Sequence, residues 1–143
     1  MQLVNRDTDY AFRALQYLAG TDDSVVSVTE LSEALRIPHP FLRRVLQKMA
    51  RRGYLRSSRG RGGGFQLASA PENISLRDLI AVFQKPIDLG HCYIRGEVCA
   101  DVRTCQLHRK LKSLERTMND ELESTTVASL MSEQKPDAAN GGT

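Results

Sequence analysis

The sequence lacks long hydrophobic runs, and its 143 residues contain no stretch near the roughly 18 consecutive apolar residues that a membrane-spanning helix needs. It also lacks an apolar segment behind a basic start, which a secretion signal would require. We therefore expect a cytoplasmic protein with no membrane partner. The length suits one small domain with an additional helix or arm, and 41% hydrophobic residues provide a modest core.

Reactive groups are also scarce. Three cysteines are an odd number and do not predict a framework of paired disulfides. There are only three histidines, and no Ser/His/Asp set or pair of carboxylates stands out, so we do not expect an enzyme. The glycine-rich run at 60–64 is not followed by the Gly-Lys-Ser/Thr of a nucleotide-binding loop.

Acidic residues are absent between Glu33 and Glu72, although the chain carries 17 of them. The same segment holds nine basic residues: Arg36, Arg43, Arg44, Lys48, Arg51, Arg52, Arg56, Arg59 and Arg61. Since the whole chain is only +3, the remaining residues together carry −6. A surface that merely keeps a protein soluble usually mixes both signs, whereas uncompensated basic residues attract the phosphates of nucleic acid. The distribution therefore predicts nucleic-acid binding. It argues against the alternative of an electron carrier, which would not need such a basic segment.

Hydrophobic spacing predicts a mainly α fold with one small hairpin. Helices are expected over 8–20, from about 28, over about 40–52, from 76 and over about 104–131. Asp7, Thr8 or Asp9 can cap the first of these helices, and Ser27 and Glu30 have the spacing of a capping box for the second. Two strands, 54–57 and 64–67, flank a turn rich in glycine and arginine.

The order of helix, tight turn, basic amphipathic helix and basic hairpin is that of a winged helix-turn-helix. Phe41 and Leu42 begin the apolar stripe of the 40–52 helix, and its basic face suits the major groove of DNA. The hairpin can place Arg59 or Arg61 in the minor groove. The predicted DNA-binding residues are His39, Pro40, Arg43, Arg44, Lys48, Arg51, Arg59 and Arg61.

Arg43 and Arg44 are adjacent and therefore point about 100° apart on a helix. Both can face the duplex only if one reads bases and the other binds the backbone.

The last predicted helix carries a single apolar seam, formed by Leu107, Leu111, Leu114, Met118 and Leu122. On a long and otherwise charged helix, such a seam is typical of an interface between two copies. We therefore expect a homodimer, with a palindromic operator as its DNA partner. The tail, 132–143, is expected to be disordered.

Cys92, Cys99 and Cys105 are separated by six and five intervening residues, unlike the paired C-x2-C of a zinc ribbon. Soft thiolate ligands favour an iron–sulfur cluster, zinc or copper(I), and the alternative is three unrelated free thiols. A fourth ligand would still be needed. The nearby candidates are His91, His108, Asp88, Glu97 and Asp101, and a distant one is Asp9.

Several motifs now carry a resemblance to a known family. They are Met1-Gln2-Leu3, Thr8-Asp9-Tyr10-Ala11-Phe12-Arg13-Ala14-Leu15, Phe41-Leu42-Arg43-Arg44-Val45-Leu46, Arg59-Gly60-Arg61-Gly62-Gly63-Gly64-Phe65-Gln66-Leu67 and the three-cysteine loop. Over residues 1–131 the chain resembles the Rrf-two (Rrf2) family of bacterial regulators, which includes the IscR, NsrR and RirA types. The resemblance implies a homodimeric winged-helix repressor or activator that holds one iron–sulfur cluster per subunit through Cys92, Cys99 and Cys105.

The resemblance leaves two candidates for the fourth ligand of the cluster. Similarity to the NsrR type implies Asp9, contributed from the partner protomer to a 4Fe-4S cluster, whereas similarity to the IscR type implies His108 and a 2Fe-2S cluster. The stretch Thr8-Asp9-Tyr10 resembles the NsrR type closely, so we favour Asp9 and the four-iron cluster. The cluster can be absent from an aerobic preparation.

The sequence therefore predicts a transcriptional regulator whose operator affinity is controlled by an iron–sulfur cluster that senses nitric oxide, redox state or iron. The alternative is a DNA-binding regulator that uses thiol chemistry or zinc without a cluster. We divide the chain into a DNA-binding domain (1–83), a cluster-binding loop (84–105), a dimerisation helix (106–131) and a tail (132–143).

Overall fold

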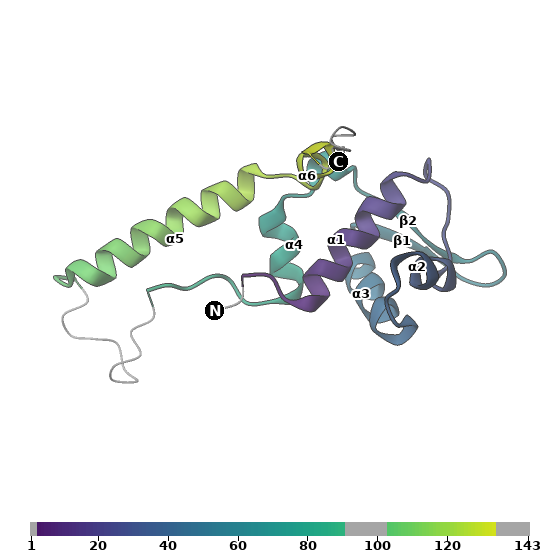
Figure 1. The fold of residues 1–143 in the computed structure, drawn as a ribbon, viewed down its shortest axis with the longest axis horizontal. Coiled ribbons are helices and arrows are strands. Elements are labelled where there is room, and N and C mark those ends of the chain that lie inside the picture. The colour runs from purple at the N-terminus through teal and green to yellow at the C-terminus, as the bar shows by residue number, and fades with distance from the viewer. Residues whose placement is uncertain (1–2, 91–102, 134–143) are drawn as a thin grey trace, which may run out of the picture.

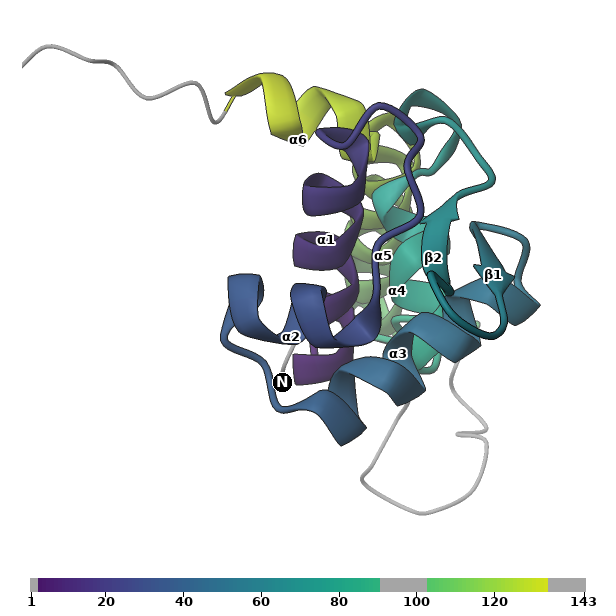
Figure 2. The same ribbon diagram turned by 90° about the vertical axis from the view of Figure 1, so that its right-hand side faces the viewer.

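The computed structural model describes residues 3–90 and 103–133, and every structural statement below refers to these residues. In chain order the elements are α1 (Arg6–Ala19), α2 (Val28–Leu35), α3 (His39–Arg51), β1 (Leu55–Ser58), β2 (Gly64–Leu67), the short 3-10 helix η1 (Pro71–Asn73), α4 (Leu76–Phe83), α5 (Gln106–Ser124) and α6 (Val127–Glu133). The predicted fold, mainly α with a two-stranded wing and a long C-terminal helix, is confirmed. Figure 1 shows α2, α3 and the β1–β2 hairpin at one end of the molecule, while α5 extends to the other, and Figure 2 looks onto the end that carries α2, α3 and the hairpin.

The first helix begins earlier than predicted because Asn5 is its N-cap. Asn5 Oδ1 accepts hydrogen bonds from the backbone N–H and the hydroxyl of Thr8, both at 2.9 Å. The prediction that Asp7, Thr8 or Asp9 caps this helix is therefore wrong. The two aspartates lie inside the first turn of α1, where their negative charge favours the positive end of the helix dipole.

The α2–α3 unit forms around a tight turn. Ser27 caps α2 as predicted, because its Oγ accepts the Glu30 backbone N–H at 3.1 Å. Arg36 then takes a left-handed conformation with φ +54°, and the next side chain, Ile37, is buried. The buried face of α3 consists of Leu42, Val45, Leu46 and Met49.

Phe41 departs from the predicted stripe of α3, since 46% of its surface is exposed. It lies about 100° around the helix from the fully buried Leu42, and it belongs to the first turn. An aromatic side chain therefore lies at the surface of the most basic helix.

The wing is an antiparallel hairpin in which Leu55 pairs with Leu67 and Ser58 with Gly64. Its first strand lies one residue later than predicted. Val26, from the segment before α2, adds an isolated bridge to Phe65 on the other edge of β2. Both backbone hydrogen bonds of this bridge are short, 2.9 and 2.8 Å, so the wing is fixed to the helical body.

We expect Gly64→Ala to lower the free energy of unfolding by about 2 kcal/mol, the usual range for forcing extra atoms into a packed site. A Cβ at Gly64 would lie 2.0 Å from the carbonyl oxygen of Val26, so the bridge must open or shift. Thermal denaturation measures the loss. Gly20→Ala is the control, because its new Cβ would have its nearest contact at an ordinary 3.5 Å. Equal melting temperatures for the two variants would contradict this account of the wing.

The prediction of one helix over 104–131 is wrong, because this segment forms two helices, α5 and α6, with a break at residues 125–126. Thr125 is extended, and Thr126 forms an isolated bridge with Ser75. Two backbone hydrogen bonds secure the break, from Leu76 N–H to Thr125 O at 2.8 Å and from Val127 N–H to Ile74 O at 2.9 Å. Three consecutive β-branched residues, 125–127, favour this extended conformation over a helix.

The core joins all parts of the helical body. Its fully buried side chains include Leu15, Leu31, Leu46, Ile74, Leu79 and Val127. Because Val127 belongs to α6, the C-terminal segment packs back onto α1 and η1 and completes this core. Helix α6 continues to Glu133, so Ser132 and Glu133 of the predicted tail are helical, and residues 134–143 lie outside the described part. Among the described helices, none is both long and apolar enough to cross a membrane.

Candidate DNA interface and cysteine segment

The basic residues of α3 separate onto two sides of the helix. Arg43 and Arg51 line a groove between α3 and the wing, together with Gln47, which lies midway between them. The spacing of four residues places these three side chains in one row. The wing contributes Arg59, Ser57 and Ser58 to the same groove.

This groove has a volume of about 820 Å³ and contains no acidic residue. Arg43, Arg51 and Arg59 therefore direct a positive field into it, and phosphate or base edges can enter from solvent. Helix α3 has the dimensions that the major groove of DNA admits. From the sequence, we did not predict Gln47, Ser57 or Ser58 as site residues. The four-residue spacing from Arg43 was the signal that could have identified Gln47.

The other side of α3 faces α1 and α4. The Arg44 guanidinium binds both carboxylate oxygens of Asp7, at 3.0 and 3.2 Å. Lys48 lies one turn further along, with its ammonium 5.3 Å from the centre of the Phe83 ring. Arg44 and Lys48 thus form a row separate from the groove residues, which suits contacts to the DNA backbone rather than to bases.

The remaining predicted DNA-binding residues are all exposed. His39 and Pro40 lie in the first turn of α3, and Arg61 lies in the turn of the wing. Gly60 and Gly62 flank Arg61 with φ +86° and +71°, conformations that other residues rarely adopt. The glycines therefore shape the exposed turn that carries Arg61.

We expect Arg59→Ala to weaken specific DNA binding by about 1–3 kcal/mol, the loss of one base or minor-groove contact. Its place in the α3–wing groove is the reason. Electrophoretic mobility shifts at several salt concentrations measure the effect. If the loss is equal on all sequences and the salt dependence falls by about one charge, Arg59 contacts phosphate only. An unchanged affinity would contradict a wing contact.

Of the three cysteines, Cys105 lies in the described part of the chain, and Cys92 and Cys99 lie outside it. Cys105 is the N-cap of α5, and its Sγ accepts the His108 backbone N–H at 3.5 Å. The positive end of a helix stabilises negative charge on a ligand sulfur at this position. His108 lies one turn along α5 and is half-buried, so these two predicted ligands are close neighbours.

Asp9 lies apart from this pair. Its carboxylate binds Arg13 Nε at 3.0 Å on the surface of α1. Figure 1 shows the beginning of α5 separated from α1 along the long axis of the molecule. The described residues bring no three His, Cys, Asp or Glu side chains together as a metal site. Within one chain, the described residues therefore do not bring Asp9 and Cys105 together in such a site.

The segment before the cysteines is anchored to α5. Glu115 accepts the Leu89 backbone N–H at 2.9 Å, and Lys112 pairs with both Glu115 and Asp88. The Leu89 N–H, followed by Lys112, lowers the pKa of Glu115 from its ordinary 4.5. Hydrogen bonds from Glu115 and then Asp88 raise the pKa of Lys112. Residues 88 and 89, which precede the cysteine region, are therefore bound to α5.

We expect Glu115→Gln to speed hydrogen exchange at the Leu89 amide, because a neutral acceptor holds the N–H less strongly. In the wild type, the charged anchor is fully present above pH 4.5 and is lost as the pH falls through the lowered pKa of Glu115. Exchange measured by mass spectrometry checks this. Thr117→Ala, on the same helix, is the control. Identical Leu89 exchange in Glu115→Gln and the wild type would contradict the anchor.

The N-terminal segment binds the end of α4, immediately before the cysteine region. Asn5 N–H donates to Gln84 Oε1 at 3.0 Å, and Asn5 Nδ2 donates to the Phe83 carbonyl at 3.2 Å. Gln84 Nε2 in turn donates to the Leu3 carbonyl at 2.9 Å. The beginning of α1 is thus tied both to residue 84 and, through Asp7, to α3.

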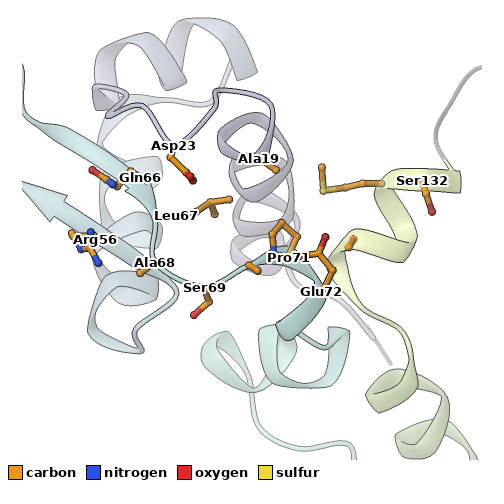
Figure 3. Close-up of a pocket in the computed structure, with 13 residues that line it drawn as sticks. Ala19, Asp23, Arg56, Gln66, Leu67, Ala68, Ser69, Pro71, Glu72 and Ser132 are labelled. Atoms are coloured by element: carbon orange, nitrogen blue, oxygen red, sulfur yellow. The ribbon is translucent and has the colours of Figure 1, made fainter.

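A second cavity, of about 780 Å³, lies between the wing, the end of α1 and α6. Figure 3 shows Leu67 pointing into it. Its charged lining residues are Asp23, Arg56 and Glu72, so both signs are present. This mixture of charges distinguishes the cavity from the basic α3–wing groove. The two carboxylates make the cavity unsuited to a nucleic-acid backbone.

The fold and the basic groove define a winged helix-turn-helix protein of the kind that binds duplex DNA. A family model described as Rrf2, iron-dependent transcriptional regulator, matches residues 4–133. The chain belongs to the Rrf2 family and is therefore a DNA-binding transcription regulator, not an enzyme.

Individual relatives agree with this. An Aquifex aeolicus protein named as an HTH-type transcriptional regulator is 33% identical over 124 residues, which cover 85% of this chain and 86% of the relative. CymR, the global cysteine regulator of B. subtilis, has a similar structure with TM-score 0.73 at 22% identity, covering 94% of this chain and all of CymR. T. potens IscR matches with TM-score 0.70 at 20% identity, covering 99% of this chain and 94% of IscR. These two structures establish similarity of fold.

Proposed function

We propose that this regulator controls its operator affinity through an iron–sulfur cluster held by Cys92, Cys99 and Cys105. The observation that carries the proposal is Cys105 at the N-cap of α5, where the helix end favours an anionic sulfur ligand. The set of three cysteines is the soft donor set that iron–sulfur clusters use. The family's description as iron-dependent adds support.

The fourth ligand we propose is Asp9 of the partner subunit, with His108 as the alternative. Asp9 lies on the surface with 45% of its side chain exposed, so a second chain can approach it. Its Arg13 partner must then release or share the carboxylate. A carboxylate oxygen is a harder ligand than a thiolate and leaves a cluster open to attack by nitric oxide or oxygen.

Dimerisation is part of this proposal, and α5 offers the surface. Leu107 and Leu114 are 66% and 45% exposed and lie on one apolar seam. Paired seams on two copies would remove both leucines from water. The N-terminal end of α5 points away from the α3–wing end of the molecule (Figure 1). Pairing along α5 therefore leaves the DNA-binding surfaces open.

The contacts around α1 connect the cysteine region to the DNA-binding surface. Gln84 binds Asn5, and two residues further along the chain Asp7 binds Arg44 of α3. When bound, the cluster supplies a group that reacts with oxidants, nitric oxide or loss of iron. A shift of residue 84 or of Asp9 then moves α1, and α1 changes the position of Arg44. Such coupling is typically worth about 1–3 kcal/mol.

A second candidate function uses the same cysteines for zinc or for reversible thiol oxidation. The similarity in fold to Staphylococcus aureus CymR, a structure described as the oxidized form, is the observation that supports this candidate. Both candidates share the DNA-binding surface and differ in what Cys105 binds.

Purification without oxygen, followed by an absorption spectrum and by analysis of iron, sulfide and zinc, tests the proposal. We expect a brown protein with iron and sulfide in equal amounts, about four of each per subunit if Asp9 is the fourth ligand. A colourless protein with bound zinc, or with no metal, would support the second candidate and contradict the first.

A further inference from the structure

Arg44 projects from the side of α3 that faces away from the core. It lies about 160° around the helix from the fully buried Leu42, and 61% of its side chain is exposed. The sequence has no acidic residue between Glu33 and Glu72, so no carboxylate of α3 or the wing neutralises this charge. A phosphate of a duplex that lies against the exposed face of α3 can therefore reach the guanidinium.

The Arg44 guanidinium is nevertheless occupied by a carboxylate from another helix. Its Nη2 donates to both carboxylate oxygens of Asp7, in the first turn of α1, at 3.0 and 3.2 Å. Asn5 is the N-cap of α1, so the helix does not need the Asp7 carboxylate in order to begin. A carboxylate and a phosphate are both anions that bind a guanidinium through charge-assisted hydrogen bonds, so the two compete for one donor.

We propose that Asp7 competes with a DNA phosphate for Arg44 and thereby lowers the affinity of this regulator for every duplex. When α3 docks, the phosphate must displace the carboxylate or lie beside it, and two anions at one guanidinium repel each other. Because phosphates carry no sequence information, the effect is the same on operator and on unrelated DNA. The inference rests on the DNA-binding role of the family and does not depend on the cluster.

The test compares full-length wild-type and Asp7→Asn proteins of equal iron content. Their dissociation constants are measured for a duplex selected from a random library and for an unrelated duplex of equal length. We expect Asp7→Asn to bind both duplexes about fivefold more tightly for each subunit in contact with DNA, the factor that an exposed ion pair can supply. The salt dependence should steepen by up to about one charge per subunit, since Arg44 is then free to neutralise a phosphate. Asp7→Ser should show the same gain.

Three further variants test the reason for the gain. Asp7→Glu keeps a carboxylate near Arg44 and should bind as the wild type does. Glu123→Gln makes the same change in net charge as Asp7→Asn, at a surface ion pair between α5 and Arg77 of α4, and should also bind as the wild type does. In an Arg44→Gln background, Asp7→Asn should have no effect, because the guanidinium for which the two anions compete is gone.

Because Asn5 caps α1, Asp7→Asn should keep a melting temperature close to that of the wild type. The inference is overturned if Asp7→Asn and Asp7→Ser bind no more tightly than the wild type, or if the gain is confined to one duplex. It is also overturned if Glu123→Gln shows the same gain, or if the gain persists without Arg44. In all of these cases the wild type still binds DNA, so the DNA-binding function stands. A wild type that binds neither duplex, even at low salt, would overturn that function and this inference together.

Discussion

A Cys105→Ala variant, purified without oxygen, should contain less than about a tenth of the wild-type iron and sulfide. The proposed cluster depends on three thiolates, and loss of one removes a soft ligand that water replaces poorly. As the N-cap of α5, Cys105 also has its sulfur at the positive end of this helix. Metal analysis and the visible absorption spectrum of both proteins measure the loss.

The N-cap role of Cys105 requires a control. Cys105→Ser keeps a side-chain acceptor for the His108 N–H, since serine is a strong N-cap residue. It should therefore preserve α5, as judged by circular dichroism, and still lose the cluster. Full iron and sulfide in Cys105→Ser would show that Cys105 acts as a cap rather than as a ligand.

The same preparation distinguishes the fourth ligands. Asp9→Ala should change the absorption spectrum and the iron count, whereas His108→Ala should leave both as in the wild type. Arg13→Gln serves as the control for the surface ion pair of Asp9, which is worth at most about 1 kcal/mol on an exposed helix. The reverse pattern, with an effect of His108→Ala alone, would assign the site to the histidine type.

Arg43→Ala should relax the preference for one base pair in each half-site and reduce specific affinity by about 5- to 150-fold. Arg43 lies in the groove between α3 and the wing, the surface that we propose to meet base edges. Arginine paired with guanine O6 and N7 is the most common specific contact in the major groove. We therefore expect a guanine whose replacement weakens the wild type and has no effect on Arg43→Ala.

Lys48→Ala is the matched comparison for Arg43→Ala, because it removes a basic residue from the other side of the same helix. It should weaken binding by a similar factor on all sequences and reduce the salt dependence by about one charge. Competition binding with single-base operator variants separates the two results. A sequence-specific loss for Lys48→Ala and a uniform loss for Arg43→Ala would reverse our assignment of the two sides.

Local patterns predicted the helix-turn-helix well, since the signals that define it lie within a few residues of one another. Ser27 has its capping partner three residues away, and the buried stripe of α3 follows helical spacing. The sequence also named Arg43 and Arg59 as DNA-binding candidates, and both line the groove between α3 and the wing. It did not show which of Arg43 and Arg44 faces the groove, because the partner of Arg44 is Asp7, 37 residues earlier in the chain.

Contacts across the fold account for the errors. Asn5, rather than Asp9, caps α1 while it also binds Gln84 and Phe83, a set of contacts 78 and 79 residues apart. The helix predicted over 104–131 is broken by pairing between residues 74–76 and 125–127, which no periodicity reveals. Phe41 was assigned to the core because its spacing allows it, although 46% of its surface is exposed.

In the regulator that we propose, the state of the cluster sets operator affinity. The most direct measurement compares the dissociation constant of one oxygen-free preparation for its selected operator before and after removal of iron by a chelator. We expect a change of about 5- to 150-fold, corresponding to a coupling of about 1–3 kcal/mol, which Cys105→Ser should abolish. Equal dissociation constants for the iron-loaded and iron-free forms would contradict it.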